Sequence, residues 1–275
     1  MHLASLDQDR AALLPAMVNA GRLNHRREAS SRLLAEEAPV ALIYNGISLA
    51  VLMATPADLT DLAVGFSLTE GIISNPAEIR DMEIICHPEG TELRAWLTTA
   101  RGRELMERRR QLVGPTGCGL CGLESLQSAT RVLPSVPRGI SLRPPQIAAA
   151  VQAMVDAQEL NRRTRATHAA GLYLPQERTI LVREDVGRHN ALDKLAGALA
   201  ARGISGCDGA LVLSSRVSVE LVQKAAMMGA GLLIAVSAPT ALAVRTAEAC
   251  GMTVIGIARG QEYDVFSHSG RILPG

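Results

Sequence analysis

The chain has 275 residues, of which 48% are hydrophobic, so it can bury one large core or two moderate ones, and we expect two domains. Its net charge of +1 excludes a global field that recruits nucleic acid or an anionic membrane, and its 2% of aromatic residues exclude a surface that stacks bases. Five cysteines form no disulfide framework in a chain of this length, and neither a signal peptide nor a long apolar span is recognised, so we expect a cytoplasmic protein.

The chain begins with a polar segment and continues with strands. Residues 1–34 are expected to form a loosely ordered N-terminal arm, to which no function is assigned. Two apolar runs over 40–44 and 48–52 predict a β-hairpin, because Asn45-Gly46 between them favours a tight turn with positive φ at both positions.

A helix is predicted after this hairpin. Thr55 is expected to be its N-cap, Pro56 lies in its first turn, and Gly71 ends it. Its apolar stripe consists of Leu59, Leu62, Ala63 and Phe66. Strands over 82–86 and 93–97 are predicted next, from their apolar residues.

A charged helix over 101–112 leads to a Cys-x-x-Cys motif, Cys118 and Cys121, which is set among glycines. Apolar residues at helical spacing follow the motif, so the thiols lie at or just before a helix N-terminus, where the helix dipole favours the thiolate. Thiol chemistry is one interpretation of this motif. A zinc site with Cys86 and His87 as further ligands is a second, and two incidental thiols are a third.

A cluster of prolines marks the expected domain boundary. Proline is excluded from helix interiors and central strands, so the cluster from Pro134 to Pro145 places the boundary near 135–143. We expect a small domain over 35–138, which carries the cysteine loop, and a second domain over 139–275. The first helix of the second domain is expected to bury Ile147, Val151, Met154 and Val155.

The second domain alternates short apolar strands with helices. Strands are predicted over 171–174, 179–182, 210–213, 232–236 and 253–257. Helices are predicted over 190–202, 218–229 and 239–250. This alternation predicts an α/β layer structure with a largely parallel sheet.

Compact polar segments follow three of the predicted strands, at the ends where open α/β sheets bind ligands. They are residues 214–218, 237–240 and 258–260. The first two open helices, whose free N–H groups attract phosphate, and Arg216 and Arg259 add donors for charge-assisted hydrogen bonds. The alternative is that Ser218 and Thr240 are ordinary N-caps.

The segment 183–190 is rich in ionisable side chains and also joins a strand to a helix. Glu184, Arg188 and His189 are candidates to line the same cleft, and a solvated ion-pair turn is the alternative. His168, before an earlier strand, is of a kind more often structural than catalytic. The chain has no dinucleotide-binding glycine motif, no Walker loop and no zinc-deaminase signature.

Segments spread over residues 40–262 form a combination that is known from one family. In chain order they are Tyr44-Asn45-Gly46, Thr55-Pro56, 61–66 with 69–71, Cys118-Gly119-Leu120-Cys121-Gly122, 183–194, Arg216-Val217-Ser218, Ala238-Pro239-Thr240 and Ala258-Arg259-Gly260. Together they resemble the formate dehydrogenase accessory sulfur-carrier family, called FdhD.

The resemblance implies both a fold and a function. The implied fold is a small N-terminal α/β roll followed by a cytidine-deaminase-like domain that lacks the deaminase zinc. The implied function is a sulfur carrier, which takes sulfur from a cysteine desulfurase and passes it to the molybdenum bis-molybdopterin guanine dinucleotide cofactor before that cofactor enters formate dehydrogenase. The family's persulfide cysteine maps to Cys118. The family's cofactor-contacting stretch maps to Ile257, Ala258, Arg259, Gly260, Gln261 and Glu262.

Thiol chemistry supplies a mechanism for such a carrier. The Cys118 thiolate attacks the outer sulfur of the donor's persulfide and becomes a persulfide itself. Cys121 either releases or protects that sulfur by attacking Cys118, or merely assists. A dithiol oxidoreductase and a zinc-stapled binding module are the rival function classes. The guanine-nucleotide cofactor is expected to bind only transiently, no permanent metal is expected, and a homodimer is compatible with the sequence.

Overall fold

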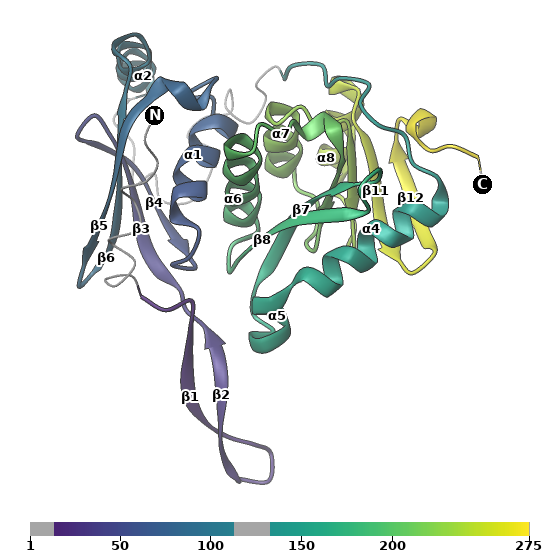
Figure 1. Cartoon of the computed structure of the whole chain (residues 1–275), viewed down its shortest axis with the longest axis horizontal. Coiled ribbons are helices and arrows are strands. Elements are labelled where there is room, and N and C mark those ends of the chain that lie inside the picture. Colours follow the sequence, from purple (N-terminus) through teal and green to yellow (C-terminus); the bar gives the residue numbers. More distant parts are fainter. Residues whose placement is uncertain (1–13, 113–132, 275) are drawn as a thin grey trace.

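The computed structural model describes residues 14–112 and 133–274, which are arranged as Figure 1 shows. A four-stranded sheet with a packed helix lies beside a six-stranded sheet that has helices on both faces, and a two-stranded ribbon projects away from both. In these two described ranges, no helix is long and apolar enough to cross a membrane.

Strands come in pairs and hairpins in the first half of the chain, and they alternate with helices from β8 to β11. The strands are β1 (Met17–Leu23), β2 (Ala29–Ala35), β3 (Ala38–Tyr44), β4 (Ile47–Ala54), β5 (Ile79–His87), β6 (Gly90–Leu97), β7 (His168–Leu174), β8 (Thr179–Asp185), β9 (Ala210–Leu213), β10 (Leu232–Ala235), β11 (Thr253–Arg259) and β12 (Glu262–Ser267). The α-helices are α1 (Leu59–Thr69), α2 (Thr99–Leu112), α4 (Pro144–Ala157), α5 (Glu159–Thr164), α6 (Arg188–Ala201), α7 (Val219–Met227) and α8 (Ala241–Cys250). The predicted α/β fold class is confirmed.

The six-stranded sheet has the order β12-β11-β10-β9-β7-β8. The pairs β9–β10 and β10–β11 are parallel, and the other three pairs are antiparallel. It follows that β8, β9, β10 and β11 all point the same way, while β7 and β12 are reversed. The sheet is therefore largely parallel in strand direction, as predicted, and its antiparallel edge strand β12 was not predicted. We call the edge where β8 to β11 end the carboxyl edge.

Alternating side chains divide the core of this sheet into two layers. Leu211 and Leu213 of β9 face α6, α7 and α8, whereas Val212 between them faces α4. The predicted buried face of α4 is confirmed except for Val155, which is 52% exposed. Val155 follows the buried Met154 by one position, and a step of about 100° round the helix takes it out to solvent.

The four-stranded sheet has the order β4-β3-β6-β5 and packs one face on α1. The predicted hairpin turn between β3 and β4 is confirmed, with φ of 48° at Asn45 and 80° at Gly46. The prediction that Thr55 is the N-cap of α1 was wrong. The cap position is Asp58, and Thr55 is instead fully buried against the second sheet. The hydrogen bonds of Thr55 to Asp185 and Val186 hold it away from the cap position that its residue type favours.

The described part of the predicted N-terminal arm is an antiparallel ribbon, not a loosely ordered segment. β1 and β2 pair over seven positions from Met17↔Ala35 to Leu23↔Ala29, and they join no other sheet. Small and polar residues are mixed irregularly with apolar ones in both strands, so the apolar alternation that predicts a strand is weak here.

The two sheets are joined where α1 crosses α6. A Cβ atom at Gly65 would collide with the backbone carbonyl of Asp193, and one at Gly197 would collide with that of Asp61. Only glycine permits backbones to approach this closely. Because the helices are in direct backbone contact, we infer that the two sheets keep a fixed relative orientation. The domain boundary near 135–143 stays a prediction.

Candidate functional site at the carboxyl edge

The three polar segments predicted to form a site do meet at the carboxyl edge. The Val217 N–H donates to the Ala238 carbonyl at 3.2 Å, and the Thr240 N–H donates to the Val217 carbonyl at 2.9 Å. The Ile257 N–H donates to the Ser237 carbonyl at 3.2 Å. The structure therefore brings together Arg216, Ser218, Thr240 and the stretch 257–262, as the carboxyl-end rule predicts.

The two residues that could be ordinary N-caps behave differently. The Thr240 hydroxyl accepts the Ala243 N–H at 3.2 Å, so Thr240 is a normal cap of α8. Ser218 occupies the cap position of α7 without capping it, because its hydroxyl donates to Glu220 Oε2 at 2.8 Å. Ser218 therefore belongs to a side-chain cluster at the carboxyl edge.

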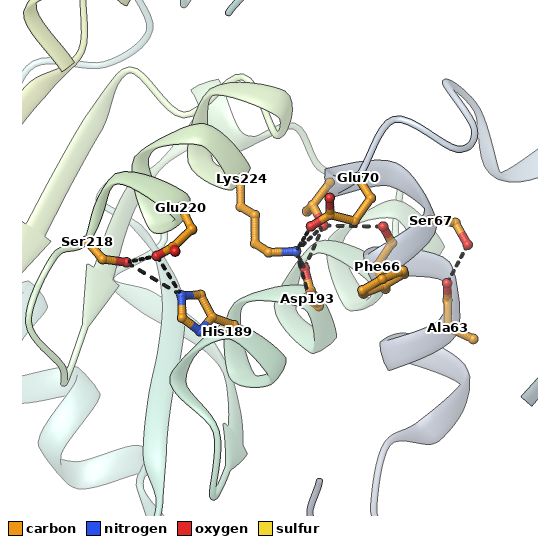
Figure 2. Close-up of polar contacts among 10 residues, drawn as sticks. Ala63, Phe66, Ser67, Glu70, His189, Asp193, Ser218, Glu220 and Lys224 are labelled. Carbon is orange, nitrogen blue, oxygen red and sulfur yellow. Dashed lines mark hydrogen bonds and ion pairs between the residues drawn. The ribbon is translucent and has the colours of Figure 1, made fainter. Parts of the chain in front are cut away.

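That cluster joins His189 to Ser218 and Glu220, as Figure 2 shows. His189 Nε2 lies 3.5 Å from Ser218 Oγ and 3.4 Å from Glu220 Oε2. Burial and the nearby Arg188 guanidinium lower the pKa of His189, so the ring is neutral at pH 7. Burial acts to raise the pKa of Glu220, but the hydrogen bond from Ser218 and the proximity of His189 outweigh it and lower that pKa.

The same cluster is not arranged as a nucleophilic triad. In such a triad the histidine takes the serine proton with one ring nitrogen and is held by the carboxylate through the other. Here one nitrogen, His189 Nε2, approaches both groups, and the Ser218 hydroxyl points its proton at Glu220. Ser218 is therefore not activated for attack, and this geometry argues against a serine hydrolase at the carboxyl edge.

Arginines and two acids, Glu220 and Glu262, supply the charges of the carboxyl edge. Arg216 and Arg259 are both exposed, and neither has a carboxylate partner among the residues that the structure describes. Arg188 adds a third guanidinium. Burial, and after it this guanidinium, lower the pKa of His168 as well. The carboxyl edge can therefore accept an anionic ligand without first breaking an ion pair.

β11 contains a strained residue two positions before its carboxyl end. Ile257 has φ of 55° and its side chain is 41% exposed, at an irregularity in the pairing of β11 with β12. A β-branched residue strongly disfavours this left-handed conformation, which costs of the order of 1–3 kcal/mol. Such strain is often retained where a backbone conformation serves binding.

Replacing this residue, Ile257→Gly, is expected to raise the free energy of unfolding by about 1 kcal/mol, because glycine adopts positive φ without strain and loses only part of that gain to unfolded-chain entropy. Urea unfolding measures the change. Val265→Gly is the control, since Val265 is exposed to 39% but has no positive φ, and it should lower stability. An equal loss in both variants would show that Ile257 is unstrained.

Only some of the charged residues in the segment 183–190 lie at the carboxyl edge. The prediction that Glu184 lines the cleft was wrong, because its carboxylate accepts the N–H groups of Leu160 at 2.8 Å and Asn161 at 2.7 Å at the start of α5. Nor is the segment a solvated turn, since Asp185 is fully buried. Arg188 and His189 do lie at the carboxyl edge, as predicted.

Asp185 is the centre of a buried network that joins the two halves of the molecule. Its carboxylate accepts from Lys194 Nζ at 2.6 Å and from the Thr55 N–H at 3.0 Å. It also accepts from the Gly187 N–H at 2.8 Å and the Asn190 amide at 3.0 Å, which orders the turn that presents His189. This network therefore fixes the position of the turn that carries His189 to the carboxyl edge.

The second lysine forms a similar junction between α1, α6 and α7 (Figure 2). Lys224 Nζ lies 2.6 Å from Glu70 Oε1 and 3.0 Å from Asp193 Oδ1, and it sits 5.2 Å from the centre of the Phe66 ring. Burial acts to lower the pKa of Lys224, but the two carboxylates outweigh it and raise that pKa. Lys194 and Lys224 are the only lysines of the chain, and no local pattern in the sequence predicts that both are buried.

Cys118 and Cys121 lie outside the described residues, so their geometry is not part of the site described above. Of the other two ligands in the zinc interpretation, Cys86 and His87 are consecutive residues of β5 and point to opposite faces of the sheet. His87 Nε2 also lies 3.5 Å from Glu92 Oε2. Their orientation argues against both of them binding one ion.

Comparison with known proteins places the chain in a family. The FdhD/NarQ family model matches residues 35–273. The chain is 51% identical over 243 residues to the sulfur carrier protein FdhD of Agrobacterium fabrum, which covers 88% of this chain and 90% of that protein. This chain belongs to the FdhD/NarQ family. The family resemblance found in the sequence is confirmed.

Other FdhD relatives cover nearly the whole chain. The sulfur carrier protein FdhD of Bordetella bronchiseptica is 43% identical over 273 residues, covering 99% of this chain and 98% of that protein. A crystal structure from Desulfotalea psychrophila, assigned as a formate dehydrogenase accessory protein, has a TM-score of 0.71 at 22% identity and covers 94% of this chain and 98% of its own. The last likeness shows that the FdhD fold is shared.

Proposed function

We propose that this FdhD-family chain carries sulfur as a persulfide on Cys118 and delivers it to the molybdenum cofactor of formate dehydrogenase. The observation that carries the proposal is 51% identity, over 88% of the chain, to a protein named sulfur carrier protein FdhD. The Cys-x-x-Cys motif at Cys118 and Cys121 supplies the only paired thiols in the sequence.

Sulfur loading follows the chemistry of thiol–disulfide exchange. The Cys118 thiolate attacks the outer sulfur of a cysteine desulfurase persulfide, a new sulfur–sulfur bond forms at Cys118, and the donor cysteine leaves as a thiolate. No external oxidant is needed. If Cys121 then attacks Cys118, the two cysteines form a disulfide, the outer sulfur leaves as sulfide, and the thiols supply the two electrons that reduce it.

The cofactor is the substrate of the delivery step, and its phosphates suit the carboxyl edge. Arg216 and Arg259 offer exposed guanidinium groups that no described carboxylate neutralises. The start of α8 adds free N–H groups, whereas the ionised Glu220 in the first turn of α7 repels a phosphate there. We therefore assign the phosphates to Arg259 and the start of α8.

Arg259→Ala is expected to weaken the binding of GDP, a fragment of the cofactor, by about tenfold to a hundredfold, because a charge-assisted hydrogen bond is worth roughly 1.5–3 kcal/mol. Calorimetric titration measures the loss, and ADP tests selectivity for guanine. Arg245→Ala, which removes an exposed arginine from the side of α8, is the matched control. No GDP binding by the intact chain at millimolar concentration would contradict this placement.

Mass spectrometry after incubation with cysteine desulfurase and cysteine tests the whole function. A sulfur carrier gains one sulfur atom on Cys118, a dithiol oxidoreductase loses two hydrogen atoms, and a zinc-stapled module retains zinc in stoichiometric amount. Only the first result supports the proposal. Either of the other two would replace it with the corresponding rival class.

A further inference from the structure

The β1–β2 ribbon is not explained by the sulfur chemistry or by the carboxyl edge. It extends away from the body of the molecule, and none of the residues in its two strands is buried. An isolated two-stranded hairpin gains little stability in water, because it has no core of its own. A long exposed ribbon of this kind therefore contributes little to the stability of the fold and is a candidate binding element.

The tip of the ribbon is ordered by its own hydrogen bonds. The Asn24 side-chain oxygen accepts the N–H groups of Arg26 at 2.9 Å and Glu28 at 3.0 Å, and its amide donates to the Glu28 carboxylate at 2.6 Å. Arg27 closes the turn with φ of 63°. The four residues after Asn24 in this turn are exposed, and a preorganised tip reduces the entropy lost on binding.

The ribbon is strongly basic. It carries Arg22, Arg26, Arg27 and Arg32 against one acid, Glu28, in a chain whose net charge is only +1. Glu28 already accepts a hydrogen bond from Asn24, while Arg22 donates to the Ser30 hydroxyl and Arg32 to the Thr164 carbonyl, both neutral groups. Among the described residues, no carboxylate pairs with these four arginines, so their charge is available to an acidic partner.

One face of the ribbon is uncharged and the other carries arginines, a pattern that suits contact with another protein. Register places Leu23 opposite Ala29 and Asn19 opposite Leu33, on a face without charged side chains, while Arg22 and Arg32 lie on the other face. Leu23 is 70% exposed at the tip. An exposed leucine next to a tip that carries Arg26 and Arg27 suits the apolar centre and charged rim of a protein interface better than a phosphate backbone. The ribbon also has no aromatic residue that could stack a base.

The root of the ribbon lies at the carboxyl edge. Arg32 donates to the Thr164 carbonyl at 3.3 Å, and Ala16 and Met17 at the start of β1 share a groove with Asp58 and with Glu184 at the end of β8. β8 ends at the same edge as β9, β10 and β11. A protein held by the ribbon would therefore face the proposed cofactor site.

The family match also separates the ribbon from the sulfur-carrier part of the chain. The FdhD/NarQ model begins at residue 35, where β2 ends, so the ribbon precedes the part of the chain that the model describes. We propose that the β1–β2 ribbon docks on an acidic surface of the enzyme that receives the cofactor, and holds that enzyme over the carboxyl edge. This inference rests on the proposed function, in which formate dehydrogenase is that enzyme.

The test uses the full chain and the purified cofactor-free formate dehydrogenase of the same organism. Arg26→Glu/Arg27→Glu is expected to weaken their association by about tenfold to a hundredfold at low salt, with a smaller difference at high salt. Arg80→Glu/Arg103→Glu makes the same change in net charge at exposed positions of β5 and α2 and should leave the association unchanged. Equal losses in the two variants, or no association of the intact chain, would overturn the proposal.

Two further measurements separate this inference from the proposed function. Loading of Cys118 by glutathione persulfide should be unaffected by Arg26→Glu/Arg27→Glu, because a small donor needs no docking surface. If Cys118 takes up no sulfur while the association still depends on the ribbon, the sulfur-carrier assignment fails and the docking surface stands. If the ribbon arginines govern binding to anionic vesicles or nucleic acid, and enzyme binding is unchanged, the docking proposal is wrong.

Discussion

Lys194→Met is expected to lower the free energy of unfolding by about 3–5 kcal/mol, because it leaves the Asp185 carboxylate buried without its cation. The Thr55 carbonyl loses the same ammonium group, which donates to it at 2.8 Å. Domains of ordinary stability unfold with about 5–15 kcal/mol, so this one change should remove a large part of the total. Urea unfolding followed by circular dichroism measures it.

Two variants make this prediction specific to a buried charge. Arg245→Met removes an exposed arginine of α8 and should change stability by less than about 0.5 kcal/mol. Asp185→Asn in the Lys194→Met background removes the unpaired charge and keeps an acceptor for the Thr55 N–H, so it should restore at least about 1 kcal/mol. A loss below about 1 kcal/mol in Lys194→Met would mean that the ion pair is not the junction inferred from its geometry.

Cys118→Ser is expected to abolish persulfide formation and to leave formate dehydrogenase inactive in cells, while the fold is retained. A hydroxyl is not ionised at neutral pH, so serine cannot attack the donor persulfide. Mass spectrometry of the purified variant and dehydrogenase activity in cells that carry only this variant measure the two effects. Full dehydrogenase activity in such cells would remove Cys118 from its assigned role.

The remaining cysteines supply the controls for Cys118. Alanine variants of Cys86, Cys207 and Cys250 should retain sulfur loading, because none belongs to the Cys-x-x-Cys motif. Because the three lie in or beside predicted strands and helix ends, the sequence predicts small buried side chains for all of them. This is correct only for Cys250, which is 3% exposed. Burial raises the pKa of Cys250 and makes it the least reactive of the three. Cys86 and Cys207 are half-buried, which makes them the more demanding controls.

The sequence by itself determined most strands of the two larger sheets and the convergence of three polar segments, but not β12 or the β1–β2 ribbon. Periodicity located those strands, because a residue's burial repeats every second position in a strand and every third or fourth in a helix. The Asn45-Gly46 turn is a local property of two residues, so it was predicted correctly. The sequence also predicted that Arg216, Thr240 and Ile257 lie at one edge, because successive parallel strands end on the same side of a sheet.

Only the tertiary structure decided which residues meet across the chain. Thr55 reads locally as a helix cap, yet its N–H donates to Asp185, 130 positions away. Glu184 and Asp185 are neighbours in one charged segment, but one caps α5 and the other is the buried partner of Lys194. Charge and periodicity give each residue a preference for burial or solvent, whereas a hydrogen-bond partner is set by packing two distant segments together. That pairing leaves no local pattern in the sequence.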